Sequence, residues 1–268
     1  MKTRISTLLV AAGSLFAQTP SRAERGRQIV DEAIKALGGR AFLEVKDRTE
    51  TGRVYSFYRE QLRGLSVARI YTRYLTPPAP PARAEGMLVR ERQSFGKKEE
   101  EYAVLFDEFK GWQITFRGAR PLPAETLERY QDSTRRNFFY IVRERLGEGG
   151  LTMEYQGAEV IENTPVSVVE INDAANNSVL VHFHQSTKLP VRQIFHRRDA
   201  QRVRHEEMTV FSKYRDVGGG VMWPYSITRF RDGEKIFEIF SESVVINQDL
   251  DDQLFTLPAS MKILPPQK

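Results

Sequence analysis

From Leu151 to Ile246 the chain alternates apolar and polar residues in short runs, and this period of two constrains the fold most strongly. Such alternation is typical of β-strands with one buried face. We expect strands at residues 151–156, 158–162, 165–172, 178–185, 190–198, 203–215, 221–231 and 234–246. Most segments between them contain Asn, Asp or Gly, the residues that tight turns require. Short strands joined by tight turns predict an antiparallel meander.

The first half of the chain shows the same alternation, and we expect it to add strands to the sheet. These strands lie at residues 48–60, 65–75, 87–95 and 101–119, the last range being a hairpin that turns between Asp107 and Gly111. Between them, Thr76 to Ala84 is rich in proline, which has neither helix nor strand potential in this pattern. We expect a surface loop there.

Two segments have the helical period of 3.6 residues instead. Residues 24–39 place Ile29, Ala33 and Leu37 on one face and end in a Gly-Gly pair, which predicts a helix and its end. Residues 123–146 carry a second apolar stripe and are followed by several glycines. We expect both segments to be helices. The second is the best candidate in the chain for covering a groove.

The first 23 residues have the order of parts of a secretory signal peptide. A short basic start is followed by an apolar run from Ile5 to Ala17, and small residues offer cleavage after Ala17 or Ala23. An apolar run of this length is too short to span a bilayer. We therefore expect a soluble periplasmic protein in which residues 24–268 form a single domain.

Composition excludes several classes of function. The chain has no cysteine, so disulfides, thiol chemistry and cysteine-bound metals are ruled out. The formal net charge is +5, and removal of residues 1–23 takes away Lys2, Arg4 and Arg22, which leaves +2. The remaining basic residues are spread along the chain rather than gathered in a stripe. This charge pattern does not indicate a nucleic-acid partner.

All four histidines of the chain lie between residues 182 and 205. They are His182, His184, His196 and His205. Two pairing registers are open for the hairpin that holds the first three. One puts His196 on the opposite face, and the other leaves it about 13 Å along the strand. His205 can approach only His196, and no carboxylate lies between Asp173 and Asp199 to complete a site. We predict that this cluster binds no metal.

Catalytic motifs are equally absent from the sequence. There is no nucleophile elbow, no phosphate-binding loop and no dinucleotide fingerprint. Acidic pairs at Glu206-Glu207 and at Glu238 and Glu242 keep a carboxylate-dependent hydrolase as a distant alternative. Charged strand faces are the ordinary explanation of such pairs. We predict a protein that is not an enzyme, with no catalytic residue and no cofactor.

The segment from Met208 to Pro258 contains an ordered set of turn and strand-end residues. The set is Tyr214, Asp216, Gly218, Gly219, Pro224, Ile246, Asn247, Leu254, Phe255 and Pro258. In this segment we expect Asp251 to cap a short helical turn that places Leu254 and Phe255 on the sheet edge. This order of residues resembles the outer-membrane lipoprotein-sorting family, the LolA-like proteins of the bacterial envelope. The resemblance is firm over residues 150–258 and looser before them.

The resemblance implies a curved antiparallel sheet that forms an unclosed half-barrel. Helices would pack in its concave side, with an apolar cavity between helices and sheet. Members of the family carry acyl chains of lipoproteins or lipids across the periplasm, and close structural relatives act as envelope-stress sensors. Our leading hypothesis is therefore a non-catalytic carrier of a lipid or lipoprotein acyl chain, for which transient membrane contact is allowed. The alternative is a sensor or interaction module that binds envelope proteins.

For the carrier, we expect the acyl chain to be lined by Trp112, Phe138, Phe139 and Ile141. Aromatic and aliphatic side chains are the usual lining of an apolar ligand site. These four residues come from the hairpin at 101–119 and from the second predicted helix. A continuous apolar cavity between that helix and the sheet would favour the carrier, and a filled core would favour the interaction module.

Overall fold

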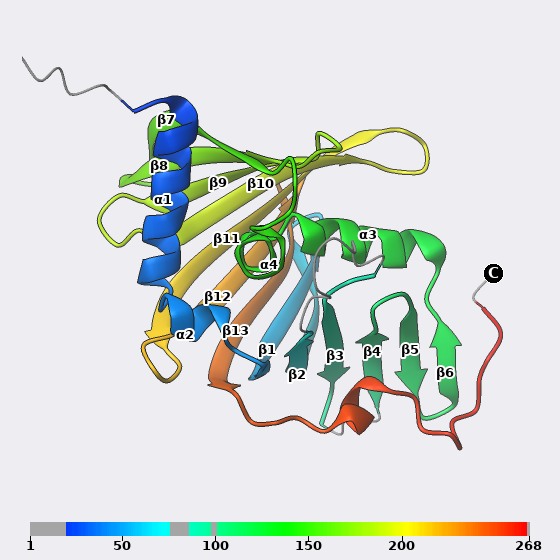
Figure 1. Ribbon diagram of the computed structural model, residues 1–268. Helices are drawn as coiled ribbons and strands as arrows, with labels where there is room; N and C mark the ends of the chain where they lie inside the picture. The colour runs from blue at the N-terminus through cyan, green and yellow to red at the C-terminus, as the bar shows by residue number, and fades with distance from the viewer. Residues whose placement is uncertain (1–19, 76–85, 98–100, 267–268) are drawn as a thin grey trace, which may run out of the picture.

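The computed structural model describes residues 20–75, 86–97 and 101–266, and these residues form one large antiparallel sheet (Figure 1). The predicted loop at residues 76–84 and most of the predicted signal peptide lie outside them. The strands in chain order are β1 Asp47–Tyr58, β2 Gln61–Tyr74, β3 Val89–Phe95, β4 Tyr102–Phe106, β5 Gly111–Thr115, β6 Gly118–Pro121, β7 Thr152–Ile161, β8 Thr164–Asn172, β9 Ser178–His184, β10 Pro190–Arg198, β11 Arg204–Asp216, β12 Met222–Arg231 and β13 Glu234–Ile246.

The order of the strands in the sheet is β6-β5-β4-β3-β2-β1-β13-β12-β11-β10-β9-β8-β7. Two meanders, β1 to β6 and β7 to β13, are therefore joined at the middle through the pairing of β1 with β13. The sheet is curved and does not close, because β6 and β7 remain its two edges (Figure 1). The predicted fold class, a mainly β protein with an unclosed antiparallel half-barrel, is confirmed.

The helices that precede β7 lie on the concave side of the sheet (Figure 1). They are α1 Arg22–Ala36, α2 Arg40–Leu43, α3 Ala124–Arg135, α4 Phe138–Tyr140 and a π-helical turn, η1 Ile141–Arg145. The segment from α3 to η1 connects edge strand β6 to the opposite edge strand β7, so it must cross the concave side. No helix within the described residues is both long enough and apolar enough to cross a membrane.

The predicted first helix is confirmed as α1. Ser21 caps it in a capping box with Glu24, and Ile29, Ala33 and the C-cap Leu37 are buried as the helical period predicts. Gly26 allows the helix to lie directly on β7, because a Cβ there would come 2.5 Å from the carbonyl oxygen of Met153. Close helix-to-strand contact thus depends on this glycine.

The prediction of one continuous helix over residues 123–146 is wrong. The helix stops at Arg135, and Asn137 adopts an extended backbone whose side chain accepts a hydrogen bond from the N–H of Phe139 at 3.0 Å. An asparagine that bonds a nearby backbone N–H favours a helix start over a helix interior. The side chain of Gln193 holds the new start by accepting from the N–H of Phe138 at 3.0 Å. As a result α3 buries no residue, and the apolar stripe begins at Phe138.

The strand boundaries follow the predicted ones with two clear differences. The first is that the hairpin expected at residues 101–119 is extended by a third strand, β6. The second is that the predicted strands 151–156 and 158–162 are a single strand, β7, whose register against β8 shifts between Tyr155 and Gly157. Gly157 has a φ of +129°, which a residue with a side chain rarely adopts. The glycine that suggested a break between two strands therefore marks a β-bulge within one.

The main core fills the space between α1, α4, η1 and the sheet. Its aromatic centre is a group of rings 5.0–6.2 Å apart, namely Phe42, Phe138, Phe139, Phe183, Phe211 and Trp223. These rings are nearly all in tilted or edge-to-face contact, the arrangement that aromatic side chains prefer. Among the described residues, the concave side beneath α4 is therefore a packed core rather than a continuous cavity.

A second apolar cluster lies on the opposite face of the sheet, over β2 to β6. The chain returns there after β13 in a short helix, η2 Asp252–Phe255, which the side chain of Asp251 caps as predicted. Phe255 is buried against Tyr71, Leu105 and Ile114. The predicted capped turn is confirmed, but its aromatic residue covers a face of the sheet rather than its edge.

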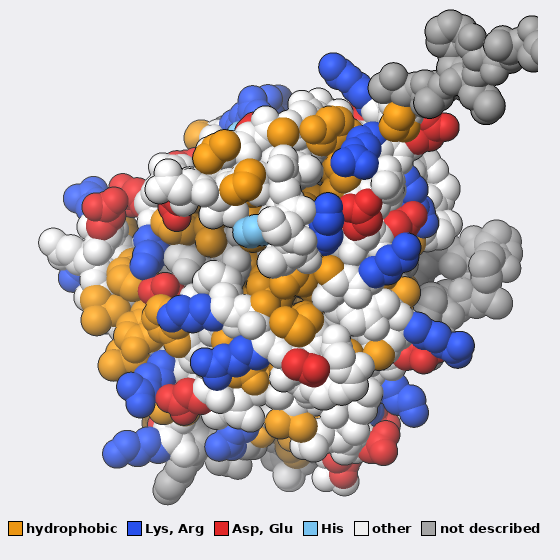
Figure 2. Space-filling model, turned by 90° about the vertical axis from the view of Figure 1, so that its left-hand side faces the viewer, with side chains coloured by type: hydrophobic (Ala, Val, Ile, Leu, Met, Phe, Trp, Pro, Cys, Tyr) orange, Lys and Arg blue, Asp and Glu red, His pale blue; other side chains and the backbone are white. Residues whose placement is uncertain are grey.

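Figure 2 shows the side of the molecule that lies to the left in Figure 1. Hydrophobic side chains form several patches there, and basic and acidic side chains are interspersed among them. No single sign of charge dominates this face, in contrast to the basic stripe of a typical nucleic-acid-binding surface.

Candidate functional site

A groove with a volume of about 750 Å³ lies at one end of the half-barrel. Small-molecule sites in proteins usually measure about 300–1,000 Å³. The groove is lined by α2 and the residues before β1, by the end of β2, by η1, by the loop between β11 and β12 and by the end of β13. Its residues are Ala41, Leu43, Glu44, Val45, Lys46, Tyr74, Leu75, Arg143, Glu144, Gly218, Gly219, Val221, Ile246 and Asn247.

The inner wall of the groove is continuous with the main core. Val45 and Val221 line the groove and are also buried members of the core cluster, with 5% and 2% exposure. Phe42, between the lining residues Ala41 and Leu43, packs against Phe139 with 6.2 Å between ring centroids. Leu43 is 37% exposed at the mouth. The apolar wall therefore runs from solvent to the edge of the aromatic core.

Arg143 forms the charged side of the groove. Its guanidinium donates to the carbonyl oxygens of Phe42 and Val45, the latter at 2.5 Å, and lies 3.8 Å from the centroid of the Tyr74 ring. These contacts tie η1 to α2 and to the end of β2. The side chain is only 4% exposed, and its Nε finds no hydrogen-bond partner. The arginine is thus a buried cation that holds three walls of the groove together.

Glu144 is the neighbouring acid in the groove wall. Its side chain is 4% exposed, and its nearest cationic atom is Nε of Arg143 at 3.8 Å, beyond hydrogen-bond distance. Burial raises the pKa of Glu144 to about 7, although the charge of Arg143 opposes this shift. The ionisation of the groove therefore changes near neutral pH.

The structure brings three of the four predicted lining residues together and separates the fourth. Phe138, Phe139 and Ile141 are 0%, 4% and 1% exposed in the core beneath the helical segment. They are not among the lining residues of the groove, which begins two residues later in η1. Their part in binding stays a prediction.

Trp112 lies on the other face of the sheet. It stands opposite Leu105 in the pairing of β4 with β5 and packs against the cluster of Phe255. It lines a smaller hollow of about 290 Å³ beside Glu108 and Lys110. Because Trp112 and Phe138 belong to separate clusters on opposite faces, a single chain-binding site cannot include both in this structure.

The histidines are distributed along β9, β10 and β11 as structural side chains. His182 is 3% exposed, and burial together with nearby Arg192 lowers its pKa to about 4. The pairing places Arg192 opposite His182, so His196 lies four residues further along β10 on the same face, as in the second expected register. Glu206 stands opposite His196. Within the described residues, no three potential ligands gather around one point.

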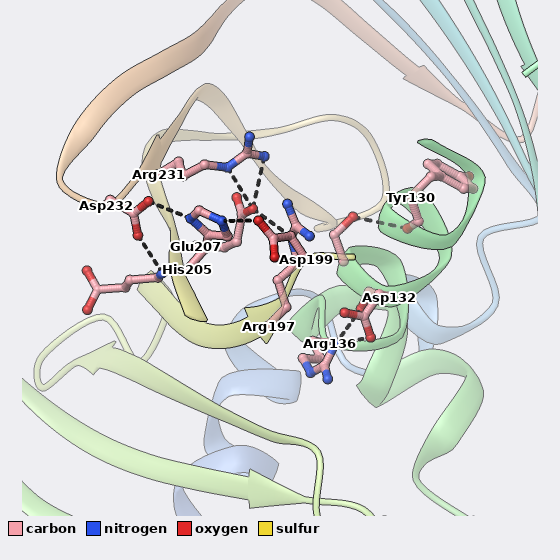
Figure 3. A network of polar contacts seen from close by, with 11 residues as sticks. Tyr130, Asp132, Arg136, Arg197, Asp199, His205, Glu207, Arg231 and Asp232 are labelled. Atoms are coloured by element: carbon pink, nitrogen blue, oxygen red, sulfur yellow. Dashed lines mark hydrogen bonds and ion pairs between the residues drawn. The ribbon is translucent and has the colours of Figure 1, made fainter. Parts of the chain in front are cut away.

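His205 belongs to a polar network at the turns of β10–β11 and β12–β13 (Figure 3). Its Nδ1 lies 2.7 Å from Asp232 and its Nε2 lies 3.1 Å from Asp199. The two carboxylates thus contact opposite ring nitrogens, so that the imidazole is a bridge between two turns. Hydrogen bonds to both carboxylates raise the pKa of His205.

The acidic residues considered for hydrolysis are held by basic side chains. Glu207 accepts hydrogen bonds from Arg197 and Arg231, at 2.9 and 3.0 Å (Figure 3). Glu238 contacts Lys235 at 3.1 Å, and Glu242 contacts Arg53 at 3.0 Å. Glu207, Glu238 and Glu242 are thus each engaged in an ion pair with a basic side chain of the sheet.

The groove residues were not predicted from the sequence. Its apolar wall comes from α2, which is only four residues long and has no detectable period, and from single residues at strand ends. One signal was present: Arg143 and Glu144 are charged residues beside the apolar stripe of the second predicted helix. Charged side chains that the fold buries are strong markers of functional sites.

Comparisons with known proteins rest on structure alone. No protein-family model matches the sequence, and no curated protein matches it significantly. A DUF1329 family protein from Desulfovibrio piger superimposes with a TM-score of 0.59 at 10% identity, over 88% of this chain and 98% of that protein. A protein domain from Vibrio parahaemolyticus, named for outer membrane lipoprotein sorting, gives 0.55 at 12% identity, over 87% and 97%.

A LolA superfamily protein from Nitrosomonas europaea gives a TM-score of 0.51 at 14% identity, over 87% of this chain and 97% of that protein. At these identities the likeness concerns the fold. The chain therefore has the half-barrel fold of LolA superfamily and outer membrane lipoprotein-sorting proteins.

Proposed function

We propose that this protein is a non-catalytic carrier that binds an acyl chain of a lipid or lipoprotein in the bacterial periplasm. The observation that carries the proposal is the groove of about 750 Å³ at the open end of a LolA-like half-barrel. Two of the similar structures bear the names of lipoprotein-sorting and LolA superfamily proteins. The predicted signal peptide supports the periplasmic location.

The physical basis of binding is burial of aliphatic surface. Leu43, Val45, Leu75, Val221 and Ile246 give the groove an apolar wall. Each methylene of a cargo that leaves water for such a wall contributes about 0.8 kcal/mol. Few polar contacts are needed, so the site selects for chain length and shape more than for chemistry.

The aromatic core sets the inner limit of the proposed site. Phe42, Phe138 and Phe139 stand behind Val45 and Val221. An acyl chain longer than the groove would have to displace these rings, and Phe138, Phe139 and Ile141 would then become lining residues as predicted. Trp112 has no part in this arrangement.

The filled core favours a second candidate, an interaction module that binds envelope proteins. A carrier with a wide internal cavity would show empty space beneath α4, where this structure has packed rings. In that case the groove would receive a peptide segment rather than an acyl chain. The two candidates differ in what the groove binds, and the same groove variants separate them.

The test is a binding titration with a fluorescent long-chain fatty acid. Leu43→Glu places a charge in the apolar mouth of the groove and is expected to weaken binding at least tenfold, because the chain would contact a solvated carboxylate. Val203→Glu is the matched control, since Val203 is an exposed apolar residue, 52% accessible, in the turn between β10 and β11. Equal binding by Leu43→Glu, Val203→Glu and wild type would remove the groove from the proposal. An absence of binding to the wild-type protein would favour the interaction module.

A further inference from the structure

The hairpin of β1 and β2 projects beyond its neighbours. Pairing of β1 with β13 ends at Ser56, and pairing of β2 with β3 ends at Ala68. Beyond these positions β1 and β2 form ladder pairs only with each other, residues 61–67 of β2 with residues 53–58 of β1. The tip turns at Arg59 and Glu60, both of which have a positive φ.

The projecting part carries four exposed apolar side chains, which we call the hairpin patch. They are Tyr58, Leu62, Leu65 and Val67, with exposures of 57%, 55%, 61% and 48%. The register sets Leu62 opposite Phe57, Leu65 opposite Tyr55 and Val67 opposite Arg53. The register shift between Ser56 and Phe57 leaves one extra residue in β2, so Leu62, Leu65 and Val67 share the sheet face that points away from the helices. Tyr58 stands at the tip.

The same face is covered further along the strand. Tyr71, four residues after Val67 on β2, is 8% exposed beneath the segment that contains Phe255. The C-terminal segment of the chain thus covers this face as far as Tyr71 and leaves the hairpin patch exposed to solvent. A contiguous exposed apolar patch on a folded protein marks a site of interaction with a partner or a membrane.

Cations surround the hairpin patch and identify the kind of partner. Three of them lie over aromatic rings of the hairpin: Arg59 and Arg63 over Tyr58 at 5.4 and 5.7 Å, and Lys235 over Phe57 at 5.0 Å. Further along the sheet, Lys213 of β11 lies over Phe240 of β13 at 4.8 Å. Lys235 also pairs with Glu238. In the part of the chain that the structure describes, no ion pair engages Arg59, Arg63 or Lys213, and the tip itself carries one acid, Glu60.

We infer that the hairpin patch docks the protein on an anionic phospholipid surface. Leucine, valine and tyrosine side chains enter the boundary between headgroups and acyl chains, and long basic side chains beside them extend to the phosphates. Both components are present on one hairpin that projects from the sheet. The inference is independent of the groove, which lies at the opposite end of β1 and β2, beside Lys46 and Tyr74.

Co-sedimentation with large unilamellar vesicles tests this inference. Wild-type protein is expected to bind vesicles of phosphatidylcholine with phosphatidylglycerol, and to bind pure phosphatidylcholine at least tenfold more weakly. Arg59→Gln/Arg63→Gln is expected to weaken binding to the anionic vesicles about 30-fold, since each arginine near such a surface contributes about fivefold. Leu62→Ser/Leu65→Ser is expected to weaken binding to both kinds of vesicle.

Phe116→Ser/Val160→Ser is the matched control, because it removes two exposed apolar side chains, 81% and 72% accessible, away from the hairpin. It should bind as the wild type does. All these positions are exposed, and circular dichroism checks that each variant is folded. The inference is overturned if wild type does not bind anionic vesicles or if the control loses as much binding as the hairpin variants. It is also overturned if Leu62→Ser/Leu65→Ser converts a dimer to a monomer, which would assign the patch to a second copy of the chain.

Discussion

Glu144 and Arg143 are adjacent buried charges whose contacts differ sharply. Arg143 satisfies its terminal nitrogens with backbone carbonyls, whereas Glu144 faces only Nε of that arginine at 3.8 Å. A carboxylate with so little compensation is costly to bury. At the scale of the residue, the groove therefore retains an acid that folding alone does not favour, as expected of a site kept for binding.

Replacing Glu144 by glutamine should stabilise the protein at pH 8 and have little effect at pH 5. The folded-state pKa of about 7 lies above the ordinary value of 4.5, so the carboxylate opposes folding increasingly as the pH rises between these values. We expect the melting temperature of Glu144→Gln to exceed that of wild type by about 3–6 °C at pH 8. Glu44→Gln, at an exposed position in the same groove, is the control. An equal gain at both pH values would contradict this role of Glu144.

The bridge of His205 predicts the opposite pH dependence. Because its carboxylate partners raise the pKa of His205 above the unfolded value of 6.5, the bridge stabilises the fold fully below pH 6.5. This contribution is lost as the pH rises through the folded-state pKa. Thermal unfolding should therefore show a larger loss for His205→Gln at pH 6 than at pH 9. His196→Gln, at a more exposed position, serves as the comparison, and a loss for His205→Gln that does not vary with pH would refute the bridge.

At the scale of the element, the local sequence predicted whether a segment is a helix or a strand better than it predicted where that element is interrupted. The period of two and the turn residues identified nearly every strand, because alternation reflects burial of one face of a sheet. The predicted interruptions were wrong at Asn137 and Gly157, where a single residue decides whether the helix or strand breaks or continues. Asn137 breaks a helix through a side-chain hydrogen bond, and Gly157 permits a bulge within a strand. Neither outcome follows from the residue type without its partner strand or helix.

The cap of α1 bears on the predicted signal cleavage. Ser21 accepts from the N–H of Glu24 at 3.1 Å, and Glu24 accepts from the N–H of Ser21 at 2.7 Å. Cleavage after Ala23 would remove Ser21 and expose the first turn, whereas cleavage after Ala17 would keep the cap, which is worth about 1 kcal/mol. We predict that the mature protein begins at Gln18. Intact-mass measurement of the exported protein checks this, and a chain beginning at Glu24 would contradict it.

The contact of α1 with β7 predicts the effect of one methyl group. Gly26→Ala would place a Cβ against the carbonyl of Met153, and overpacking of this kind costs about 1–3 kcal/mol. Gly147→Ala is the control, because a Cβ at that position meets no atom within 4 Å. Urea unfolding should show a loss of stability for Gly26→Ala and not for Gly147→Ala. Equal stabilities of the two variants would show that α1 does not lie this close to β7.

At the scale of the whole molecule, the sequence predicted the half-barrel but did not predict the groove. The resemblance carried by Tyr214, Asp216 and Pro224 concerns turns and strand ends, which specify how a sheet is connected. The groove instead depends on α2, η1, the ends of β2 and β13 and the loop between β11 and β12 meeting at one end of the sheet. That meeting is a consequence of curvature, which joins positions about 100 residues apart, such as Phe42 and Arg143. Phe138, which we expect to line the acyl chain, is a fully buried member of the core.

The central claim is that the groove at the open end of the half-barrel holds an acyl chain. Native mass spectrometry of the protein purified from its own bacterial envelope tests this most directly. We predict a species heavier than the mature chain by the mass of a lipid or an acylated protein, and its loss in Leu43→Glu. Recovery of the wild-type protein only at its own chain mass, with no bound lipid or acylated protein, would contradict the account.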